Sequence, residues 1–394
     1  MGRGSTSSGV PVVTYVVVQG GVMRPRLKDV FWERSGAELR LVSDGQEQVR
    51  LDDPDGMLEL LLDLLCKGSR TPPELAEVVG VPVAAVDRVV DTLDRYRLLV
   101  DDERSGRIAA DTRDRFADNL AFFEPYATLA LGREEMLERL RSAHVLLLGL
   151  GGVNMTVAAH LCGLGVDRLT VVDAGTILAR DLGWQPLARS RDVGARTVRR
   201  AAAWLRDTEP ALHVDAVDAA VTSASTLAAM LDRYCPDLVI VDAVGPPAAA
   251  GSGPKADPTV GGDGVDTWVN AACVAAGLPF VRAVSGPAGG TVYSVDPGRS
   301  GCVACLVSGS ASGQTPVVMR WLNQRPGGGL RIAPMAGLLG SLVAFEALRF
   351  LTGFEPPAYA GQPVHVDIGS GGVLRRLGWQ RSLTCPVCRT ADPR

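Results

Sequence analysis

The sequence predicts an α/β protein whose larger part is a Rossmann-like domain with a mainly parallel sheet. A short apolar strand ends at Leu148 and is followed directly by a glycine turn with Gly149, Gly151 and Gly152. A helical stretch of small and apolar residues then leads into a second strand, which ends on Asp173. Such glycines let N–H groups at a helix N-terminus approach a phosphate, and an acid about twenty residues further on can hold ribose hydroxyls. We therefore expect these three glycines and Asp173 to bind a nucleotide.

Strands and helices continue to alternate after this unit. We expect strands at 213–217, 237–242 and 279–284, with helices at 195–207 and 267–276 between them. Such alternation is typical of a parallel sheet with crossover helices.

Four further stretches complete this part of the chain. Residues 115–142 read as a helix that leads into the first strand, and 246–266 as a mobile Gly/Pro/Ala-rich insertion. Residues 334–352 form a small-residue helix suited to close packing, and 364–379 read as a terminal hairpin.

Residues 24–102 predict a separate, small winged-helix (α+β) domain. A hairpin signal at Asp44-Gly45 joins two short strands. Three helices follow, at 57–67, 72–80 and 83–98. We interpret residues 1–23 as a flexible N-terminus and 103–114 as a linker. The first helix has Asp53 or Asp55 as its cap, and Thr71 caps the second.

Charge decides what this small domain binds. It has 11 lysines and arginines against 17 aspartates and glutamates, a net charge of −6. Phosphate contacts supply most non-specific affinity for DNA, so this charge disfavours a DNA-binding regulator. A peptide added as a strand beside the hairpin and packed on the third helix fits better. A structural appendage without a ligand is the alternative. The expected peptide-binding residues are Val49, Leu51, Val86, Val90 and Leu93.

Bulk composition excludes several classes of protein. The 394 residues are 46% hydrophobic, and the formal net charge of −4 gives no basis for binding nucleic acid or a membrane surface. We find no apolar run of roughly 18 residues to span a bilayer and no signal peptide. Four of the eight cysteines are isolated and four form two CxxC pairs. This pattern is typical of a reduced, cytoplasmic protein.

The two CxxC pairs predict a structural zinc site. They are Cys302 with Cys305 (CVAC) and Cys385 with Cys388 (CPVC), and two such turns can present four thiolates to one tetrahedral Zn²⁺. A four-cysteine site has no open position, so we expect it to pin the C-terminal part, 302–388, to the sheet. Two accidental turns or disulfides are the alternatives.

Two single residues are open to two interpretations. Cys273, in the predicted helix 267–276, is either a thiolate nucleophile or a small buried residue. We favour burial, because free cysteines are usually buried and inert. Trp184 is either a lid over the nucleotide pocket or a core residue. The four histidines are scattered, and we assign none of them a role.

From Arg115 to its end, the sequence resembles the ThiF/MoeB superfamily, which has the fold of ubiquitin-activating enzymes. The stretches that carry the resemblance are LLLGLGGVNM, GVDRLTVVDAG, WVNAACVAAGLPFVRAVSGPAGGTVYSVDPG, CVACL, GLLGSLVAFEALRFLTG and CPVC, in the family's order. Family members adenylate a C-terminal carboxylate with ATP and Mg²⁺, usually as homodimers. The resemblance implies this fold for residues 115–394, a homodimer, and Asp173 at the ribose.

Two motifs of the family are altered where they should meet ATP. The family's Arg-aromatic-x-Arg is Arg115-Phe116-Ala117-Asp118 here, so an aspartate replaces the second arginine. The family's Asn-Leu-x-Arg-Gln falls on residues 181–185, DLGWQ, and Trp184 stands in for the phosphate-binding arginine.

Three single positions are altered as well. The family's lysine falls on Thr197, its magnesium-binding aspartate on Gly245, and the last glycine of its loop on Asn154. Arg180 and Arg196 lie near enough in sequence to compensate in part. Because nucleotidyl transfer depends on electrostatic stabilisation, these changes predict that adenylation is lost and make ATP and Mg²⁺ doubtful cofactors.

Residues 24–102 resemble the PqqD-like recognition element of ribosomal-peptide (RiPP) biosynthesis. Fused to a ThiF-like domain with a degenerate nucleotide site, this element resembles the ocin-ThiF-like, F/C-type partner protein of azoline-forming YcaO cyclodehydratases. In that family the partner captures a precursor's leader peptide, and a YcaO enzyme uses ATP to convert Cys, Ser or Thr into thiazoline or oxazoline rings. The resemblance implies a non-catalytic subunit, with the YcaO enzyme as a separate chain.

The rival hypothesis is enzymatic. It is an adenylating, peptide-modifying enzyme of the microcin-type ThiF family, with phosphate contacts from Arg180, Arg189 or Arg196. Pyrophosphate exchange with ATP and a precursor peptide separates the two hypotheses.

Overall fold

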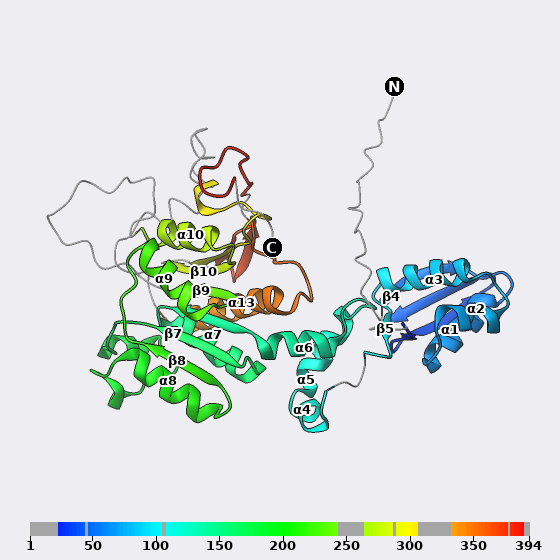
Figure 1. The fold of residues 1–394 in the computed structure, drawn as a ribbon, viewed down its shortest axis with the longest axis horizontal. Helices are drawn as coiled ribbons and strands as arrows, with labels where there is room; N and C mark the ends of the chain where they lie inside the picture. Colours follow the sequence, from blue (N-terminus) through cyan, green and yellow to red (C-terminus); the bar gives the residue numbers. More distant parts are fainter. Residues whose placement is uncertain are drawn as a thin grey trace. The chain divides into compact units, whose positions relative to one another are not determined.

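The computed structural model (Figure 1) describes residues 23–43, 46–104, 108–242, 264–286, 289–305, 332–376 and 379–389. The chain divides into two compact units, of which the first comprises 1–109 with 127–132 and the second 110–126 with 133–394. The predicted turn at Asp44-Gly45, the position Gly245 and most of the insertion 246–266 lie outside the described residues, as do the N-terminal 22 residues.

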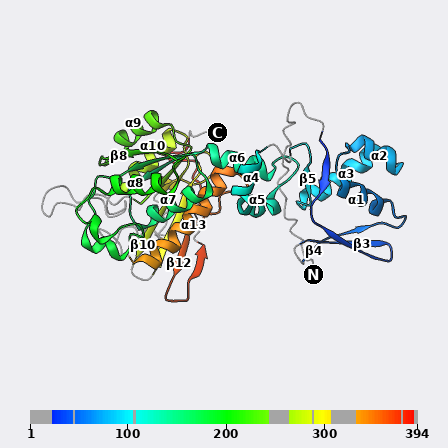
Figure 2. The ribbon, with the colours of Figure 1, turned by 90° about the horizontal axis from the view of Figure 1, so that it is seen from below.

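The first unit contains two small antiparallel sheets. One pairs β1 with β5, and the other has the order β2-β3-β4 (Figure 2). The strands are β1 (Pro25–Leu27), β2 (Phe31–Ser35), β3 (Glu38–Ser43), β4 (Gln46–Asp52) and β5 (Leu99–Asp101). At the end of the three-stranded sheet, β4 has a hydrogen-bonded neighbour on one side only within the described part of the chain.

The three helices expected in the first unit are confirmed to within a few residues. They are α1 (Met57–Lys67), α2 (Pro72–Val79) and α3 (Val83–Arg95). Thr71 and Glu74 form a capping box at the start of α2. The buried Asp53 carboxylate accepts the N–H groups of Leu58 and Glu59 in the first turn of α1. The expected caps are therefore present.

The second unit is built on an eight-stranded sheet in the order β13-β12-β11-β10-β9-β6-β7-β8. Neighbouring strands from β8 to β10 run parallel, and those from β10 to β13 run antiparallel. The strands are β6 (His144–Leu148), β7 (Arg168–Val172), β8 (His213–Val217), β9 (Leu238–Val241), β10 (Phe280–Gly286), β11 (Gly289–Val295), β12 (Val364–Asp367) and β13 (Val373–Arg376). The predicted Rossmann-like α/β fold with a mainly parallel sheet is confirmed.

Helices cover both faces of the parallel strands (Figure 2). One face carries α9 (Ala224–Tyr234) and α10 (Val265–Ala275); the other carries α7 (Gly152–Leu164), α8 (Thr197–Thr208) and α13 (Ala333–Thr352). Because both faces are covered, every residue of β6 is buried. This double burial explains why the strand reads as an unbroken apolar run rather than as an alternating one.

The predicted long helix 115–142 is wrong. It is divided into α4 (Ala110–Arg115), α5 (Ala117–Phe123), a 3₁₀ turn (Glu124–Tyr126) and α6 (Arg133–Ser142). Pro125 lacks an N–H group and falls in the 3₁₀ turn, which ends the first helical part. Residues 127–132 then join the first unit before α6 begins in the second.

Helix α13 is long and apolar enough, by length and composition alone, to cross a membrane. This finding corrects the expectation that no such stretch exists. In the structure α13 packs on α7, α6, β10 and β11 as a core helix of the second unit. Its buried Glu346 accepts hydrogen bonds from the Ser294 hydroxyl and from the N–H groups of Ala358 and Tyr359. The carboxylate thereby holds the segment after α13 against β11.

Candidate functional site

A pocket of about 360 Å³ opens at the carboxyl ends of the parallel strands. Its lining includes Leu148 and Gly149 after β6, Asp173 after β7, Asp242 after β9, and the segment 219–222 after β8. Strand β6 lies between β7 and β9, and the helix after β6 (α7) covers one face of the sheet while the helix after β9 (α10) covers the other (Figure 2). Such a switch point is where open α/β sheets bind ligands. The predicted nucleotide-binding residues Gly149, Gly151 and Asp173 line this pocket.

The glycine turn has the geometry expected of a close backbone approach. Gly149 has a φ of +80°, which favours glycine, and its N–H group bonds the carbonyl of Val172. A Cβ on Gly152 would lie 2.5 Å from the carbonyl oxygen of Trp184. The turn therefore needs glycine at both positions, and Gly152 begins helix α7.

Carboxylates of the chain itself occupy backbone donors around this turn. Asp173 accepts the N–H groups of Leu150, at 2.8 Å, and Gly175, at 2.6 Å. Asp242 accepts the N–H group of Asn154, in the first turn of α7, at 3.2 Å. A Cβ on Gly151 would lie only 2.2 Å from an oxygen of Asp242. The Asp242 carboxylate thus lies where the N-terminus of α7 would otherwise hold an external anion.

The altered family positions have structural roles. The Asn154 side chain donates to the carbonyls of Gly149, at 2.8 Å, and Ile240, at 3.2 Å, so it ties β6 to β9. Thr197, at the position of the family's lysine, is buried and its N–H group bonds Gly175. Trp184 is 7% exposed; its ring also lies against Gly152 and lines both the main pocket and a second one of about 20 Å³. The core interpretation of Trp184 is supported.

The nearby arginines differ in what they contact. Arg196 pairs with Asp218, with Nε and Oδ2 2.9 Å apart, and this hydrogen bond raises the pKa of Arg196 and lowers that of Asp218. Arg180 lines the pocket. Arg189 is exposed and does not line it among the described residues. Arg115 forms an ion pair with Glu209.

The charge of the pocket is negative. Of its described lining residues, Arg180 is the one cation, against the three carboxylates of Asp173, Asp181 and Asp242. Asp118, which replaces the family's second arginine, instead lines a separate apolar pocket of about 330 Å³ between α5, α7 and α13. The polar and glycine residues present fit the nucleoside part of ATP, whereas the three carboxylates oppose a triphosphate that carries no metal ion. Sequence reasoning did not assign Asp181 or Asp242 to the pocket. Asp242 directly follows β9, and an acid at such a strand end is a signal for this edge of the sheet, whereas Asp181 lies in a 3₁₀ turn (Ala179–Gly183) and has no such signal.

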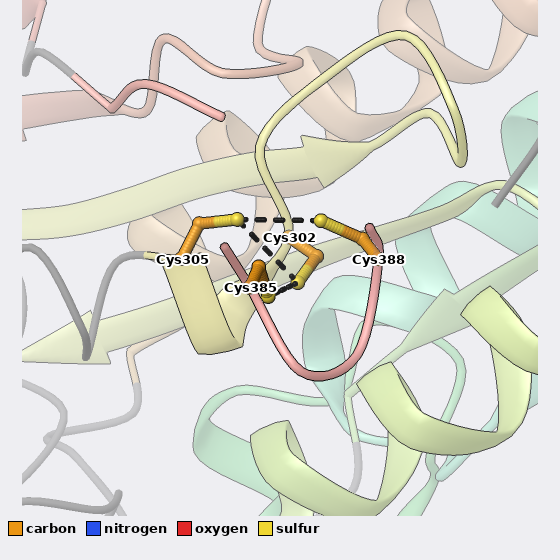
Figure 3. A group of neighbouring side chains, drawn as sticks. All are labelled: Cys302, Cys305, Cys385 and Cys388. Atoms are coloured by element: carbon orange, nitrogen blue, oxygen red, sulfur yellow. Dashed lines mark hydrogen bonds between the residues drawn. The ribbon is translucent and has the colours of Figure 1, made fainter. Parts of the chain in front are cut away.

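The four predicted zinc ligands lie together (Figure 3). The sulfur atoms of Cys302, Cys305, Cys385 and Cys388 all lie within 4.8 Å of one another and are buried, and none forms a disulfide. Neighbouring Sγ–Sγ distances are 3.9, 3.6 and 3.3 Å. A tetrahedral ion with Zn–S bonds of about 2.3 Å would set them about 3.8 Å apart. The donor set therefore fits a metal ion with no open position.

Hydrogen bonds position both halves of the cysteine cluster. The Trp379 indole donates to the carbonyl of Cys302 at 3.0 Å, and the Ser382 N–H group donates to the sulfur of Cys305 at 3.3 Å. Burial raises the pKa of Cys302 and Cys305. Burial also acts to raise the pKa of Cys385, but nearby N–H groups and thiols lower it to about 7. A bound cation would favour the thiolate at all four positions.

Cys273 lies in the core. It is fully buried on α10, and burial raises the pKa of its thiol far above the ordinary value. This environment fits the interpretation as a buried helix residue.

The five predicted peptide-binding residues are mostly covered. Val86, Val90 and Leu93 on α3 are 0–2% exposed and, with Val49, belong to the core of the first unit, whereas Leu51 is half-buried. The apolar stripe of α3 therefore packs on its own unit, and this corrects the prediction that its side chains meet a peptide. The remaining candidate for peptide binding is the edge of β4, with Leu51 beside it.

The sequence pattern of the ThiF family matches residues 124–248 and 264–387. The chain belongs to the ThiF family. Protein HesA, vegetative, of Trichormus variabilis is 29% identical over 257 residues, covering 65% of this chain and 84% of the relative. The sulfur carrier protein ThiS adenylyltransferase of Escherichia coli K12 is 28% identical over 264 residues, covering 65% and 90%. The ThiF-like fold implied by the resemblance is thus confirmed.

A solved structure is similar over a longer part of the chain. That of E. coli MccB has a TM-score of 0.68 and 18% identity, and the match covers 94% of this chain and 98% of MccB. Because only 6% of this chain is left out, the similarity of fold extends into the first unit. MccB has also been solved with ATP and, as the microcin C7 biosynthetic enzyme, with N-formylated MccA. These relatives lend no support to the doubt about ATP, which rests on the residues of the pocket.

Proposed function

We propose that this protein binds the leader of a ribosomally made precursor peptide and presents it to a separate YcaO cyclodehydratase. The first unit, as a winged-helix PqqD-like recognition element, binds the leader along β4. The second unit is a ThiF-type platform that does not itself adenylate. In this proposal the YcaO subunit supplies the ATP chemistry that forms thiazoline or oxazoline rings.

One observation carries the proposal. The Asp242 carboxylate lies against Gly151 and accepts an N–H group of the first turn of α7, which is where ThiF-type enzymes need an anion of ATP. With Asp173 and Asp181 also in the lining, a triphosphate would meet three like charges and one arginine. Like charges at such separations oppose binding by several kcal/mol in a partly desolvated site, and adenylation needs the opposite arrangement.

The four-cysteine cluster has a structural role in this proposal. With four buried thiolate donors and no open position, the expected ion is Zn²⁺. It would hold residues 302–305, which follow β10 and β11 in the chain, beside the segment 385–388. All eight cysteines are free, so we place the protein in the reducing cytoplasm. A homodimer is part of the proposal, and analytical ultracentrifugation tests it.

The edge of β4 supports peptide binding by strand addition. An added strand forms main-chain hydrogen bonds with an edge strand, and neighbouring side chains give specificity. Leu51, half-buried on β4, would contact an apolar residue of the leader. Leu51→Glu should weaken leader binding about tenfold or more, because a carboxylate replaces that contact. Phe31→Glu on β2, the far edge of the same sheet, is the matched control and should leave binding unchanged.

Two measurements test the proposal together. Fluorescence anisotropy with a labelled leader should show saturable binding by the wild-type chain. ATP–pyrophosphate exchange with the full precursor should show no signal above the protein-free background. Leader-stimulated exchange by the chain alone would refute the non-catalytic role, and equal binding by the Leu51→Glu and Phe31→Glu variants would refute the site.

The second candidate function is an adenylating enzyme that modifies a peptide carboxylate. It is favoured by the relatives, since a 28% identical protein is an adenylyltransferase and MccB is a biosynthetic enzyme solved with ATP. In this case Arg180 would contact the phosphates. Leader-stimulated exchange that is lost in Arg180→Ala is the expected result for this candidate.

A further inference from the structure

The main pocket has two parts of opposite character. Its walls at the ends of β7 and β8 are mostly small or apolar residues, among them Val172, Ala219, Ala220 and Val221, and they include the Asp173 carboxylate. Its floor, at the start of α7, carries the Asp242 carboxylate. The volume of about 360 Å³ lies within the range of about 300–1,000 Å³ that small-molecule sites occupy. The pocket therefore has the size of a small-molecule site, and the Asp242 carboxylate occupies the end at which an anion would bind.

Asp173 still has acceptor capacity for a ligand. Each oxygen of its carboxylate receives one backbone N–H group, from Leu150 and Gly175, and a carboxylate oxygen can accept a second hydrogen bond. Asp173 is half-buried at the pocket wall. It can accept two neighbouring hydroxyl groups, which is the pattern a ribose offers.

The opposite end of the pocket excludes phosphate. The N–H group of Asn154 is bound to Asp242, and a Cβ on Gly151 would already collide with the same carboxylate. A phosphate at this position would have to displace a negative group, in a pocket whose described lining also carries Asp181 and has Arg180 as its one cation. The hydroxyl-accepting end is thus present while the phosphate-accepting end is not.

We propose that this pocket binds a nucleoside that carries no phosphate, and that it discriminates against nucleoside triphosphates. The proposal rests on the proposed function in one respect only, namely that the pocket no longer serves adenylation. The proposal assigns a class of ligand to a pocket for which the proposed function names no ligand. Nucleoside binding would stabilise the ends of β6, β7 and β9 by mass action.

Calorimetric titration of the full-length chain, as purified with its metal, tests the proposal with defined probes. Adenosine, guanosine, cytidine and uridine are compared with AMP and with ATP plus Mg²⁺. At low salt, we expect the best nucleoside to bind at least about tenfold more tightly than its monophosphate or ATP. Raising the salt concentration should narrow this difference, because screening weakens repulsion from the carboxylates and leaves the neutral ligand unaffected.

A charge-removing variant sharpens the test. Asp242→Asn should raise the affinity for ATP by about tenfold and leave that for the nucleoside within about twofold, since only the charged ligand meets Asp242. Asp232→Asn, an equal change on the exposed side of α9, should change neither affinity. The salt titration of the wild-type chain tests the electrostatic repulsion of ATP without a variant.

The outcomes separate this inference from the proposed function. If ATP binds as tightly as every nucleoside, or no nucleoside binds, the inference is overturned, whatever the leader does. If pyrophosphate exchange occurs with the precursor, the proposed function is overturned even where a nucleoside binds. Preferential nucleoside binding without exchange supports both.

Discussion

Loss of one cysteine from the four-cysteine cluster should release the metal and destabilise the second unit. We choose Cys385→Ser, because Cys385 is buried and its sulfur lies 3.6 Å from that of Cys302 in the other CxxC pair. A serine hydroxyl is a poor zinc ligand and leaves three buried sulfur atoms without their shared cation. We expect the wild-type chain to carry one zinc per chain and the variant to carry much less.

The size of the effect follows from burial. All four sulfur atoms are buried and join residues more than eighty positions apart, with Sγ–Sγ contacts between Cys302 and Cys385 and between Cys305 and Cys388. Loss of a structural metal belongs to the mutations that cost about 4 kcal/mol or more. At about 2–4 °C per kcal/mol for a domain of this size, the melting temperature should fall by about 8–16 °C.

The assay pairs metal analysis with thermal unfolding. Elemental analysis of the purified chain gives zinc per protein, and circular dichroism gives the melting temperature with and without a chelator. Cys235→Ser is the matched control, since Cys235 is exposed and lies outside the cluster; it should keep the zinc and shift melting by little. A metal-free wild-type chain, or one whose melting temperature does not respond to the chelator, would refute the reasoning.

Three further predictions concern single residues. Asp53→Ala should destabilise the first unit by about 2–4 kcal/mol in urea unfolding, because it removes the carboxylate that caps α1 and pairs with Arg34. Burial acts to raise the pKa of Asp53, but its hydrogen bonds with the N–H groups of α1 and with Arg34 lower the pKa overall. The stability that Asp53 gives the first unit should therefore be present above the ordinary aspartate pKa of 3.8 and be lost as the pH falls below it. A variant as stable as the wild type at pH 7 would contradict this. Cys273 should resist alkylation at pH 8 in the folded chain, since burial raises its pKa, and Cys273→Ala should bind leader as wild type does; rapid modification measured by mass spectrometry would show an accessible thiol. Gly152→Ala should lower stability and disturb the fluorescence of Trp184, because its Cβ would meet the Trp184 carbonyl at 2.5 Å; an unchanged spectrum and melting temperature would show that the contact relaxes freely.

The parallel sheet and the cysteine cluster were predictable because each has a local signal. Strands β6, β7 and β9 are covered on both faces, so they appear as apolar runs whose ends can be read to within a residue or two. The CxxC pairs carry their chemistry in the sequence itself. Strand β11 was missed, although the alternating TVYSV of residues 291–295 is a strand pattern.

Helical periodicity could not show which residues of the first unit are accessible to a peptide. The apolar stripe of α3 marks the face that is buried, and Val86, Val90 and Leu93 are covered by their own unit. An apolar stripe on a helix thus identifies the residues that face the core, and those residues are covered and cannot contact a ligand. The role of Asp242 was equally out of reach, since it depends on how closely the end of β9 approaches the first turn of α7.

The position of Trp184 bears on how the fold would accommodate the arginine of the family motif. Trp184 is buried and its ring lies against Gly152, at the position where the family motif has an arginine. Restoring an arginine there would remove a large apolar ring and place a charge among apolar neighbours, at a cost in folding stability. The residues around it would have to change at the same time. A Trp184→Arg substitution alone therefore destabilises the fold, which makes this departure from the family motif hard to undo.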